Sequence, residues 1–472
     1  MTKNENPRYV AAKTLQAVFF KGAYSHLALD EQLKNHQLSA VDQRFVTEVV
    51  YGTIKRLNTI DYLLNGVMKN KVHKSDQRIQ VILRMAVYQM FYLDRIPERA
   101  AIHEAVELSK QWGEVGLKGL INGVLRSLSR QGLPDFSSIT PSSKRIAIET
   151  SHPEWLVKRW INAYGEEETM RLCATNSERG KTAVRVNLRV STVDAVQIEL
   201  SEEGIETVKG ELATESLIVT QGVVTKSAAF KEGRLSIQDE SSMLVARALN
   251  PKPSMKMLDA CAAPGGKTMH AAELMNDEGE IIANDVHAHK KRLIEKEANR
   301  LQLSIVHATT EDAVNLAATY QDVRFDRILV DAPCSGLGVL RSKPDIKWNT
   351  DEKEIQKLPA LQLDILNAAS KLLKDDGVLV YSTCTILPEE NEHVVQEFLK
   401  NNEDFTHDES LQERIKIQSE NQGYTTILPH QYGSDGFFYL CNEEGKCSSW
   451  KRELKSEILR KQQQMENDQF FH

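Results

Sequence analysis

The chain has 472 residues, of which 41% are hydrophobic and 26% are charged. This composition is typical of a globular protein that is long enough for two or three domains. Its six cysteines form no Cys-x-x-Cys pair and no Cys/His cluster with zinc-ligand spacing, so we expect neither a metal site nor a disulfide framework. The first residues are polar and no apolar run has the length of a membrane span, which predicts a cytoplasmic protein that contacts no membrane.

The net charge of −7 is unevenly distributed along the chain. Residues 1–150 contain 21 Lys and Arg against 14 Asp and Glu, whereas residues 151–472 contain 38 against 52. A basic segment joined to an acidic one favours a polyanion-binding module beside a catalytic domain. A charged solvated surface explains so modest an excess nearly as well.

Helical periodicity dominates the first part of the chain. Apolar residues recur at helical spacing from Tyr9–Phe20 onward, and no β-rich stretch interrupts them, so we predict an all-α bundle over residues 1–140. The Pro- and Ser-rich segment 133–143 is typical of a linker. Residues 150–235 are predicted to form a small α+β insert, with strands at 183–188 and 216–220.

Strand and helix patterns alternate over residues 236–446. Such alternation indicates βαβ units around a parallel sheet with helices on both faces, a Rossmann-like α/β domain. Residues 447–472 form a polar tail that we expect to lie outside this fold. The predicted strands are 255–259, 279–284, 304–309, 325–331, 378–382, 425–428 and 436–441, and the predicted helices are 267–274, 289–301, 353–373 and 388–401.

The first of these strands runs into a glycine-containing turn, in the segment MLDACAAPGGKT of Met257–Thr268. A Walker A loop needs a glycine five places before its second glycine, and Cys261 stands there, so the phosphate nest of an NTPase is not expected. The dinucleotide fingerprint GxGxxG is absent as well. The small residues instead let the backbone close on a ligand where the strand turns into a helix.

An adenosine ligand without a pyrophosphate fits this turn best. Asp285 ends the next predicted strand, where a carboxylate can bind both hydroxyls of a ribose. We therefore predict S-adenosylmethionine as the cofactor, with its amino-acid end at the turn and its adenine amino group near Asp312. The alternatives are ordinary capping roles, a helix N-cap for Asp285 and a loop cap for Asp312.

Two cysteines, each just beyond a predicted buried strand, are the most specific feature of the chain. Cys334 lies in FDRILVDAPCSG and Cys384 lies in GVLVYSTCT. In open α/β sheets the ligand crevice lies outside the carboxyl ends of the strands. The pair therefore suggests covalent chemistry in which one thiol attacks and the other assists. The alternative is two small buried residues, because free cysteine is among the most buried residue types.

Methylation of carbon 5 of a pyrimidine would use such a pair. A thiolate that adds to carbon 6 lets carbon 5 attack a methyl-sulfonium, and a second cysteine near carbon 5 can help to release the product. Asp331, three residues before Cys334, is placed to bind ring nitrogen 3 and the exocyclic amine of cytosine. Lys267 is the cation that we expect to favour the thiolate, with an ordinary surface lysine as the alternative.

The segments LDACAAPGGKT, DAPCSGLG, YSTCTILPEENE and QDESS resemble the signatures of the RNA 5-methylcytosine methyltransferases of the NOL/NOP/Sun family. The helical first domain resembles the NusB-like RNA-binding fold. The resemblance covers about residues 1–442 and implies a class I methyltransferase domain that modifies cytosine 967 of 16S rRNA, as free rRNA or in an assembling small subunit. The third motif departs from the family, since it reads Thr-Glu-Asp-Ala where many relatives have Gly-Asp.

The resemblance also assigns roles to the site residues. It implies that Cys384 is the nucleophile and that Cys334 assists product release, whereas in DNA cytosine methyltransferases the cysteine of the Pro-Cys motif attacks. Asp331 and Lys267 complete the predicted catalytic set. The cofactor contacts that the resemblance implies are Cys261, Ala262, Ala263, Pro264, Gly265, Gly266, Lys267, Asp285, Asp312 and Asp331.

Two other functions remain open at this point. The enzyme could take tRNA as its substrate instead of rRNA. The chain could also be a NusB-like RNA-binding factor with a vestigial methyltransferase domain, although an inactive domain would need neither cysteine, nor Asp285, nor the glycine turn. We expect a monomer.

Overall fold

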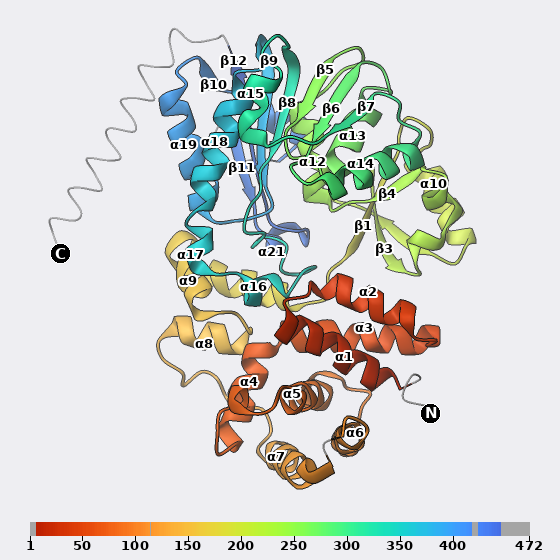
Figure 1. The fold of residues 1–472 in the computed structure, drawn as a ribbon, viewed down its shortest axis with the longest axis vertical. Coiled ribbons are helices and arrows are strands. Elements are labelled where there is room, and N and C mark those ends of the chain that lie inside the picture. Colours follow the sequence, from red (N-terminus) through yellow and green to blue (C-terminus); the bar gives the residue numbers. More distant parts are fainter. Residues whose placement is uncertain (1–5, 114, 418–422, 445–472) are drawn as a thin grey trace, which may run out of the picture. The chain divides into compact units, whose positions relative to one another are not determined.

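The computed structural model describes residues 6–113, 115–417 and 423–444, so the predicted tail over 447–472 lies outside the described residues. The chain forms two compact units (Figure 1). Of the described residues, the helical unit comprises 6–113, 115–180, 336–352 and 428–433, and the sheet unit comprises 181–335, 353–417, 423–427 and 434–444. The units are thus interleaved in sequence, which the prediction of consecutive domains did not anticipate.

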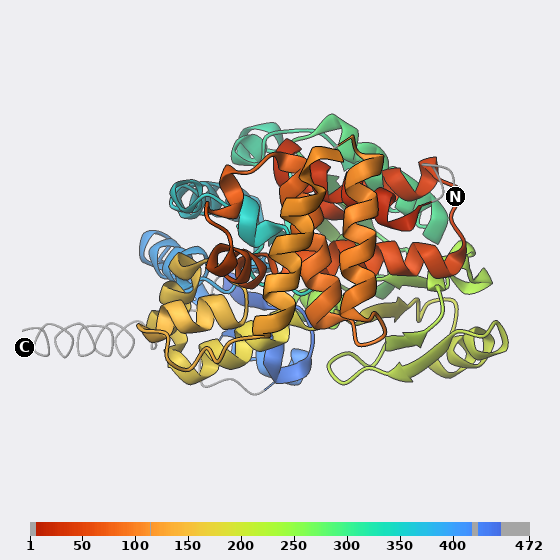
Figure 2. The same ribbon diagram turned by 90° about the horizontal axis from the view of Figure 1, so that it is seen from below.

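The helical unit begins with the predicted all-α bundle. Its core consists of buried aliphatic side chains from successive helices, such as Leu15, Val49, Ile82 and Leu125. Helices α5, α6 and α7 pack against one another and run side by side (Figure 2). The α-helices are α1 (Pro7–Lys21), α2 (Ser25–Asn35), α3 (Ala40–Lys55), α4 (Leu57–Val67), α5 (Gln77–Tyr92), α6 (Glu98–Gln111), α7 (Lys118–Gln131), α8 (Ser142–Glu149) and α9 (Glu154–Ser177), with short 3₁₀ turns η2 (Val72–Lys74) and η3 (Val115–Leu117).

A segment beyond the first cysteine motif also belongs to the helical unit. Residues 336–352 contain the short helix α16 (Ile346–Asn349), and residues 428–433 contain α21 (Pro429–Tyr432). The ammonium of Lys347 is buried there and donates to the carbonyls of Lys55 (3.1 Å) and Ser151 (2.5 Å). A buried amine needs hydrogen-bond partners, so these two bonds stabilise the packing of residues 336–352 against the helices.

The predicted α+β insert is a four-stranded antiparallel sheet in the order β2-β3-β1-β4, and it lies in the sheet unit. Its core is aliphatic and includes Val184, Leu200 and Leu217. The strands predicted at 183–188 and 216–220 are confirmed, within two residues at each end. The elements are β1 (Thr182–Val186), α10 (Val193–Glu202), β2 (Glu206–Lys209), β3 (Ser216–Gln221), η4 (Val224–Lys226), α11 (Ala228–Lys231) and β4 (Leu235–Ile237).

The rest of the sheet unit is the predicted Rossmann-like domain. Its sheet has the order β10-β12-β9-β8-β5-β6-β7, and β11 pairs with β12. The five strands from β9 to β7 are parallel, whereas β10, β11 and β12 join by antiparallel pairing. The strands are β5 (Lys256–Asp259), β6 (Glu280–Asn284), β7 (Val306–Thr309), β8 (Phe325–Asp331), β9 (Leu373–Thr383), β10 (Phe405–His407), β11 (Tyr424–Ile427) and β12 (Phe437–Glu444).

Helices cover both faces of this sheet. Ile328 and Val330 of β8 pack in one core cluster with residues of α18 and α19, whereas Leu329 between them points to the other face and is equally buried. Helix α12 contacts β8, β9 and β12, and α13 contacts β6 and β7. The helices are α12 (Glu240–Leu249), α13 (Gly266–Leu274), α14 (Ala288–Leu301), α15 (Leu316–Thr319), α17 (Glu352–Ile355), α18 (Leu358–Ser370), α19 (Glu392–Asn401) and α20 (Leu411–Ile415), with η5 (Ala313–Asn315) and η6 (Pro388–Glu390).

Two predicted helices differ in extent from the structure, and the one expected over 388–401 is divided at Asn391 into η6 and α19. The helix expected over 353–373 is divided into α17 and α18, and Pro359 stands at the start of the second. Proline lacks the N–H that a helix interior needs and fits the first turn instead. The end of the predicted helix is also strand, because β9 already begins at Leu373.

Candidate active site

The order of the strands reverses between β5 and β8. From β5 the chain proceeds outward through β6 to β7, and from β8 it proceeds the other way to β9. In open α/β sheets ligands bind at such a reversal, outside the carboxyl ends of the strands. The glycine turn comes after β5 and the Pro-Cys motif comes after β8, so the predicted cofactor turn and one cysteine meet at this point.

The two cysteines lie together at this edge of the sheet. The Sγ atom of Cys334, beyond β8, is 3.4 Å from the Sγ atom of Cys384, beyond β9. A disulfide has an S–S distance of about 2.05 Å, so the two thiols lie within hydrogen-bonding distance and are not joined by a disulfide. Both side chains are partly exposed, which leaves them accessible to a substrate.

A buried carboxylate holds the two cysteine loops in place. Glu390, fully buried on η6, accepts a hydrogen bond at Oε2 from the backbone N–H of Ser335 (2.8 Å) and another from the side-chain amide of Gln362 (3.0 Å). Its Oε1 accepts from the Ser335 hydroxyl (2.5 Å), which also lies 2.9 Å from the hydroxyl of Thr385. Burial raises the pKa of Glu390, and these hydrogen bonds oppose that rise. The residues directly after Cys334 and Cys384 are thereby linked through one side chain.

Lys267 and Asp331 form an ion pair at the switch point. The Lys267 ammonium lies 2.7 Å from Asp331 Oδ2, and the Ser382 hydroxyl donates to Asp331 Oδ1 at 2.9 Å. Burial alone would lower the pKa of Lys267, but the charge of Asp331 and the hydrogen bond to it outweigh burial and raise the pKa, and Cys384 contributes in the same direction. With 15% of its side chain exposed, Lys267 is not the surface lysine that the sequence left as the alternative.

The turn after β5 is built around a second buried carboxylate. Asp259 accepts from the Thr268 hydroxyl (2.6 Å), while its other carboxylate oxygen is buried without a hydrogen-bond partner. Burial raises the pKa of Asp259 to about 7. Gly265 has φ +110°, a conformation that favours glycine, and a Cβ added at Gly266 would meet no atom within 4 Å. The turn therefore leaves open space beside its backbone.

The remaining residues of the predicted turn are tied to the neighbouring strand. The backbone N–H of Ala262 donates to the carbonyl of Asn284 at the end of β6 (2.7 Å). Cys261 packs against the core, and burial raises its pKa, so it is not a reactive thiolate. Ala263 and Pro264 complete the turn before α13.

The two distal carboxylates differ in their environment. Asp285 is buried directly after β6, and its Oδ1 accepts from the N–H of His287 (3.0 Å) and lies 3.5 Å from the Lys290 ammonium. The N-cap of α14 is His287, so Asp285 does not take the capping role that the sequence left open. Asp312 is exposed and does cap, since its side chain accepts from the N–H of Val314 (3.2 Å).

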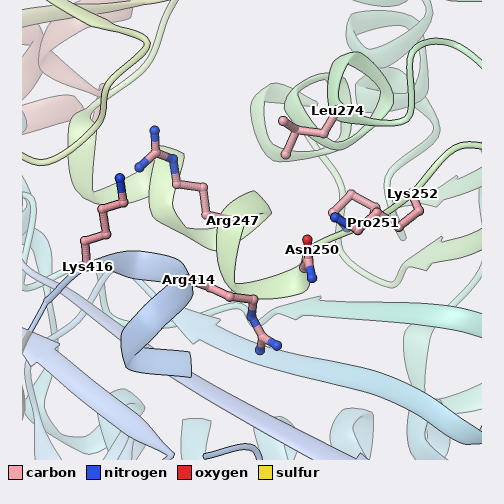
Figure 3. A pocket seen from close by; sticks show the side chains of 7 residues that line it. All are labelled: Arg247, Asn250, Pro251, Lys252, Leu274, Arg414 and Lys416. Carbon is pink, nitrogen blue, oxygen red and sulfur yellow. The ribbon is translucent and has the colours of Figure 1, made fainter. Parts of the chain in front are cut away.

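A basic pocket lies at the opposite edge of the same sheet. It has a volume of about 340 Å³ and is formed where α12 ends, before β5 begins, and near the end of α13 (Figure 3). The glycine turn lies at the other end of β5, and none of the predicted site residues lines the pocket. Its lining residues are Arg247, Asn250, Pro251, Lys252, Leu274, Arg414 and Lys416.

Sequence reasoning missed the residues that support the site. Glu390 and Asp259 lie inside the signature motifs, but neither was assigned a role. Glu390 had no distinguishing signal, because Glu389 and Glu392 stand beside it and only Glu390 is buried. Gln362 had no signal either, since it is a polar residue in the first half of a helix and only the tertiary fold brings it to Glu390.

Within the described residues, no group of three or more His, Cys, Asp and Glu side chains is arranged to hold a metal ion. The same part of the chain contains no helix long and apolar enough to cross a membrane.

Comparisons with known protein families divide the chain into three matched segments. Residues 5–130 match the NusB family, residues 152–225 match the ferredoxin-like domain of RsmF/B-like methyltransferases, and residues 246–441 match the family described as 16S rRNA methyltransferase RsmB/F. These matches confirm the predicted fold classes of the bundle, the insert and the Rossmann-like domain.

Individual proteins agree with the family models. The chain is 43% identical over 447 residues to the probable ribosomal RNA small subunit methyltransferase B of Bacillus subtilis (strain 168), which covers 94% of this chain and 100% of the relative. The crystal structure of the protein PH0851 superposes with a TM-score of 0.78 at 26% identity and covers 93% of this chain and 99% of that one. The structure of NSun6 from Pyrococcus horikoshii has the same fold, with a TM-score of 0.56 and 24% identity. The match covers 62% of this chain and 99% of that one.

The match to the Bacillus relative extends over almost the whole chain, and the three family models lie within it. The chain belongs to the RsmB/F family of 16S rRNA methyltransferases.

Proposed function

We propose that this rRNA methyltransferase uses S-adenosylmethionine to methylate carbon 5 of a cytosine in 16S rRNA, with Cys384 as the nucleophile that adds to carbon 6 and Cys334 as the thiol that assists release. The observation that carries the proposal is the contact between the two sulfur atoms, 3.4 Å apart at the topological switch point. Carbons 5 and 6 are bonded neighbours in the ring, so two thiols in contact can face both of them.

Each thiol has a separate task in this reaction. The Cys384 thiolate forms a bond to carbon 6, which turns carbon 5 into a nucleophile for the methyl group. After carbon 5 has gained the methyl group, its proton would pass to a base beside the ring, the bond between Cys384 and carbon 6 would break, and the thiolate would be restored. Cys334, on the adjacent loop, would act near carbon 5 in this second half of the reaction. The assignment is based on the family resemblance of the Thr-Cys motif, and it is open to direct test.

Asp331 and Lys267 would activate the ring and the thiol. A carboxyl group that carries a proton while the base is bound can donate to nitrogen 3 of cytosine and accept from the exocyclic amine, which draws charge from carbon 6. The Lys267 ammonium holds one oxygen of Asp331, and its positive charge favours the Cys384 thiolate over the thiol. Ser382 holds the other oxygen and fixes the orientation of the carboxylate.

The turn after β5 fits a methionine-type cofactor. The unpartnered oxygen of buried Asp259 lies beneath a turn with open space at Gly266, and Asp285 presents a buried carboxylate at the end of the next strand. Residues Cys261 to Lys267 would contact the amino-acid end, Asp285 the ribose, and Asp312 the adenine; a bound S-adenosylmethionine supplies an electrophilic methyl group. The NSun6 structure was solved with SFG, an analogue of this cofactor.

The substrate is proposed to be cytosine 967 of 16S rRNA, in free rRNA or in an assembling small subunit in the cytoplasm. A base must leave its stack to present its ring to a thiol, so an unpaired site is the substrate that the chemistry requires. The NusB-like bundle and the ferredoxin-like insert would grip the strand through its phosphates. A tRNA substrate is the alternative within the same chemistry.

Labelled S-adenosylmethionine with unmodified 16S rRNA tests the proposal. We expect the label to appear as 5-methylcytosine, and bisulfite mapping of rRNA and tRNA from a deletion strain would name the nucleotide. Methylation of tRNA alone would show that tRNA, and not 16S rRNA, is the substrate. A methylated base other than cytosine would contradict the proposed chemistry.

A further inference from the structure

A fully buried arginine connects the ferredoxin-like insert to the turn after β5. Arg185, the fourth of the five residues of β1, has 1% of its side chain exposed. It forms a bidentate ion pair with Glu273 of α13, with Nε to Oε2 at 3.0 Å and Nη2 to Oε1 at 2.7 Å. Its remaining nitrogen, Nη1, donates to the side-chain oxygen of Gln238 and to the backbone carbonyl of Gly266 at 3.1 Å.

The energetics indicate that this arrangement is specific to arginine. A buried charge is costly unless it is paired and hydrogen-bonded, and Glu273 is also almost fully buried. The planar guanidinium satisfies a carboxylate with one edge while its other edge reaches two further acceptors. An ammonium in the same place could not span Glu273, Gln238 and Gly266 together.

The contact with Gly266 also orients the backbone of Lys267, the next residue. The peptide bond between Gly266 and Lys267 is planar, so the direction of the Gly266 carbonyl sets the direction of the Lys267 N–H. Gly266 is the first residue of α13, whose first-turn N–H groups have no acceptor within the helix. Arg185 therefore fixes the N-terminal turn of α13 at one end through Gly266 and farther along the helix through Glu273.

We propose that Arg185 is a positioning residue for the cofactor, through which the insert holds the Gly266–Lys267 peptide and α13 in the geometry that binds the amino-acid end of S-adenosylmethionine. This inference rests on the proposed function, because it takes the turn to be the cofactor site. Arg185 itself does not touch the reacting atoms. It acts through the turn, and it makes cofactor affinity depend on a strand of the insert.

The Arg185→Lys variant keeps a positive charge opposite Glu273. It removes the planar guanidinium that contacts Glu273, Gln238 and Gly266 together. We expect its dissociation constant for S-adenosylmethionine, measured by calorimetry on the full chain without RNA, to rise about ten-fold, the effect of losing one charge-assisted hydrogen bond. In methyl-transfer assays the loss should appear in KM for S-adenosylmethionine. The KM for rRNA and kcat at saturating cofactor should stay within about two-fold of the wild-type values.

The double variant Arg185→Met/Glu273→Met separates positioning from folding. Replacing both charges by apolar side chains of similar length leaves no buried charge unpaired, so the protein should stay folded by thermal unfolding while cofactor affinity falls as in Arg185→Lys. Arg300→Lys is the matched control. Arg300 also joins the insert to a methyltransferase helix, through the carbonyls of Phe230 and Leu235, but it does not contact the turn.

Cofactor affinities of the wild type, the two Arg185 variants and Arg300→Lys together test the positioning role of Arg185. Weakened cofactor binding in both Arg185 variants, with Arg300→Lys unchanged, supports the positioning role. Wild-type affinity in both folded Arg185 variants, or an equal loss in Arg300→Lys, would overturn it. If the wild-type chain itself binds no S-adenosylmethionine, the proposed function fails first, and that result is visible before any variant is compared.

Discussion

Asp331 of β8 and Ser382 of β9 are register partners in the parallel sheet, and a hydrogen bond of 2.9 Å joins their side chains. Cys334 lies three residues after Asp331, and Cys384 lies two residues after Ser382. The register thus brings two loops to the same level beyond the sheet, and the sulfur atoms that they carry come into contact at 3.4 Å. The proximity of the thiols is a consequence of strand pairing and of the Glu390 clamp.

Glu390→Gln should weaken catalysis without weakening cofactor binding. The substitution removes the carboxylate that accepts hydrogen bonds from Ser335 and Gln362. An NH₂ group in place of either carboxylate oxygen would face a donor of Ser335 or Gln362. We expect kcat to fall about ten-fold or more, since a shift of about 1 Å in a reacting group is enough for such a loss. The dissociation constant for S-adenosylmethionine should not change. Glu389→Gln, at the adjacent position, is the control, and an equal loss there would contradict the clamp.

Lys267→Met should lower the methylation rate about 100-fold, the effect of removing one preorganised charged donor from an active site. The substitution leaves Asp331 without its cation and removes the positive charge near Cys384. Lys374→Met is the matched control, because Lys374 of β9 pairs with Asp326 of β8 at 2.6 Å, at the opposite end of β8 from Asp331. The account is contradicted if single-turnover rates of the two variants agree.

Asp259→Asn should change the pH dependence of stability. The pKa of Asp259 is about 7 in the folded protein, against the ordinary value of 3.8. Between these values the folded protein binds a proton that the unfolded chain has lost, so this group makes stability fall as pH rises, and the full penalty is present above about pH 7. The asparagine variant should therefore be more stable at pH 8, by at most about 4 kcal/mol, and nearly equal to wild type at pH 4.

Urea unfolding of the wild type and of Asp259→Asn at both pH values measures this difference directly. A constant offset between the two proteins across the range would mean that Asp259 ionises normally in the folded state.

The repeating patterns of the sequence predicted most of the fold. Buried strands such as β8 and helices such as α14 have strong periodicity, and the structure places both within one residue of their predicted bounds at each end. The helix predicted over 353–373 was an exception. Its apolar spacing indicated one continuous helix, but Pro359 begins a separate helix there. The interleaving of the two units could not be predicted, because nothing in residues 336–352 themselves shows that Lys347 is buried among distant helices.

The candidate site was predictable to a similar degree. Cys334, Cys384 and Asp331 were predicted from their positions at strand ends, and Lys267 was predicted as the nearby cation. In the structure the two cysteines contact each other and Lys267 contacts Asp331. Glu390, Gln362 and Arg185 escaped prediction, because their roles depend on partners far away in the chain. Arg185 left a faint signal, as a single charged residue within an otherwise apolar strand.

Trapping of a covalent complex tests most directly whether Cys384 is the nucleophile and Cys334 assists release. Cys334→Ala and Cys384→Ala are each incubated with S-adenosylmethionine and unmodified 16S rRNA, and protein–RNA adducts are resolved under denaturing conditions. The account predicts that Cys334→Ala accumulates an adduct and that Cys384→Ala forms neither adduct nor product. Accumulation in Cys384→Ala, with none in Cys334→Ala, would contradict it and exchange the two roles.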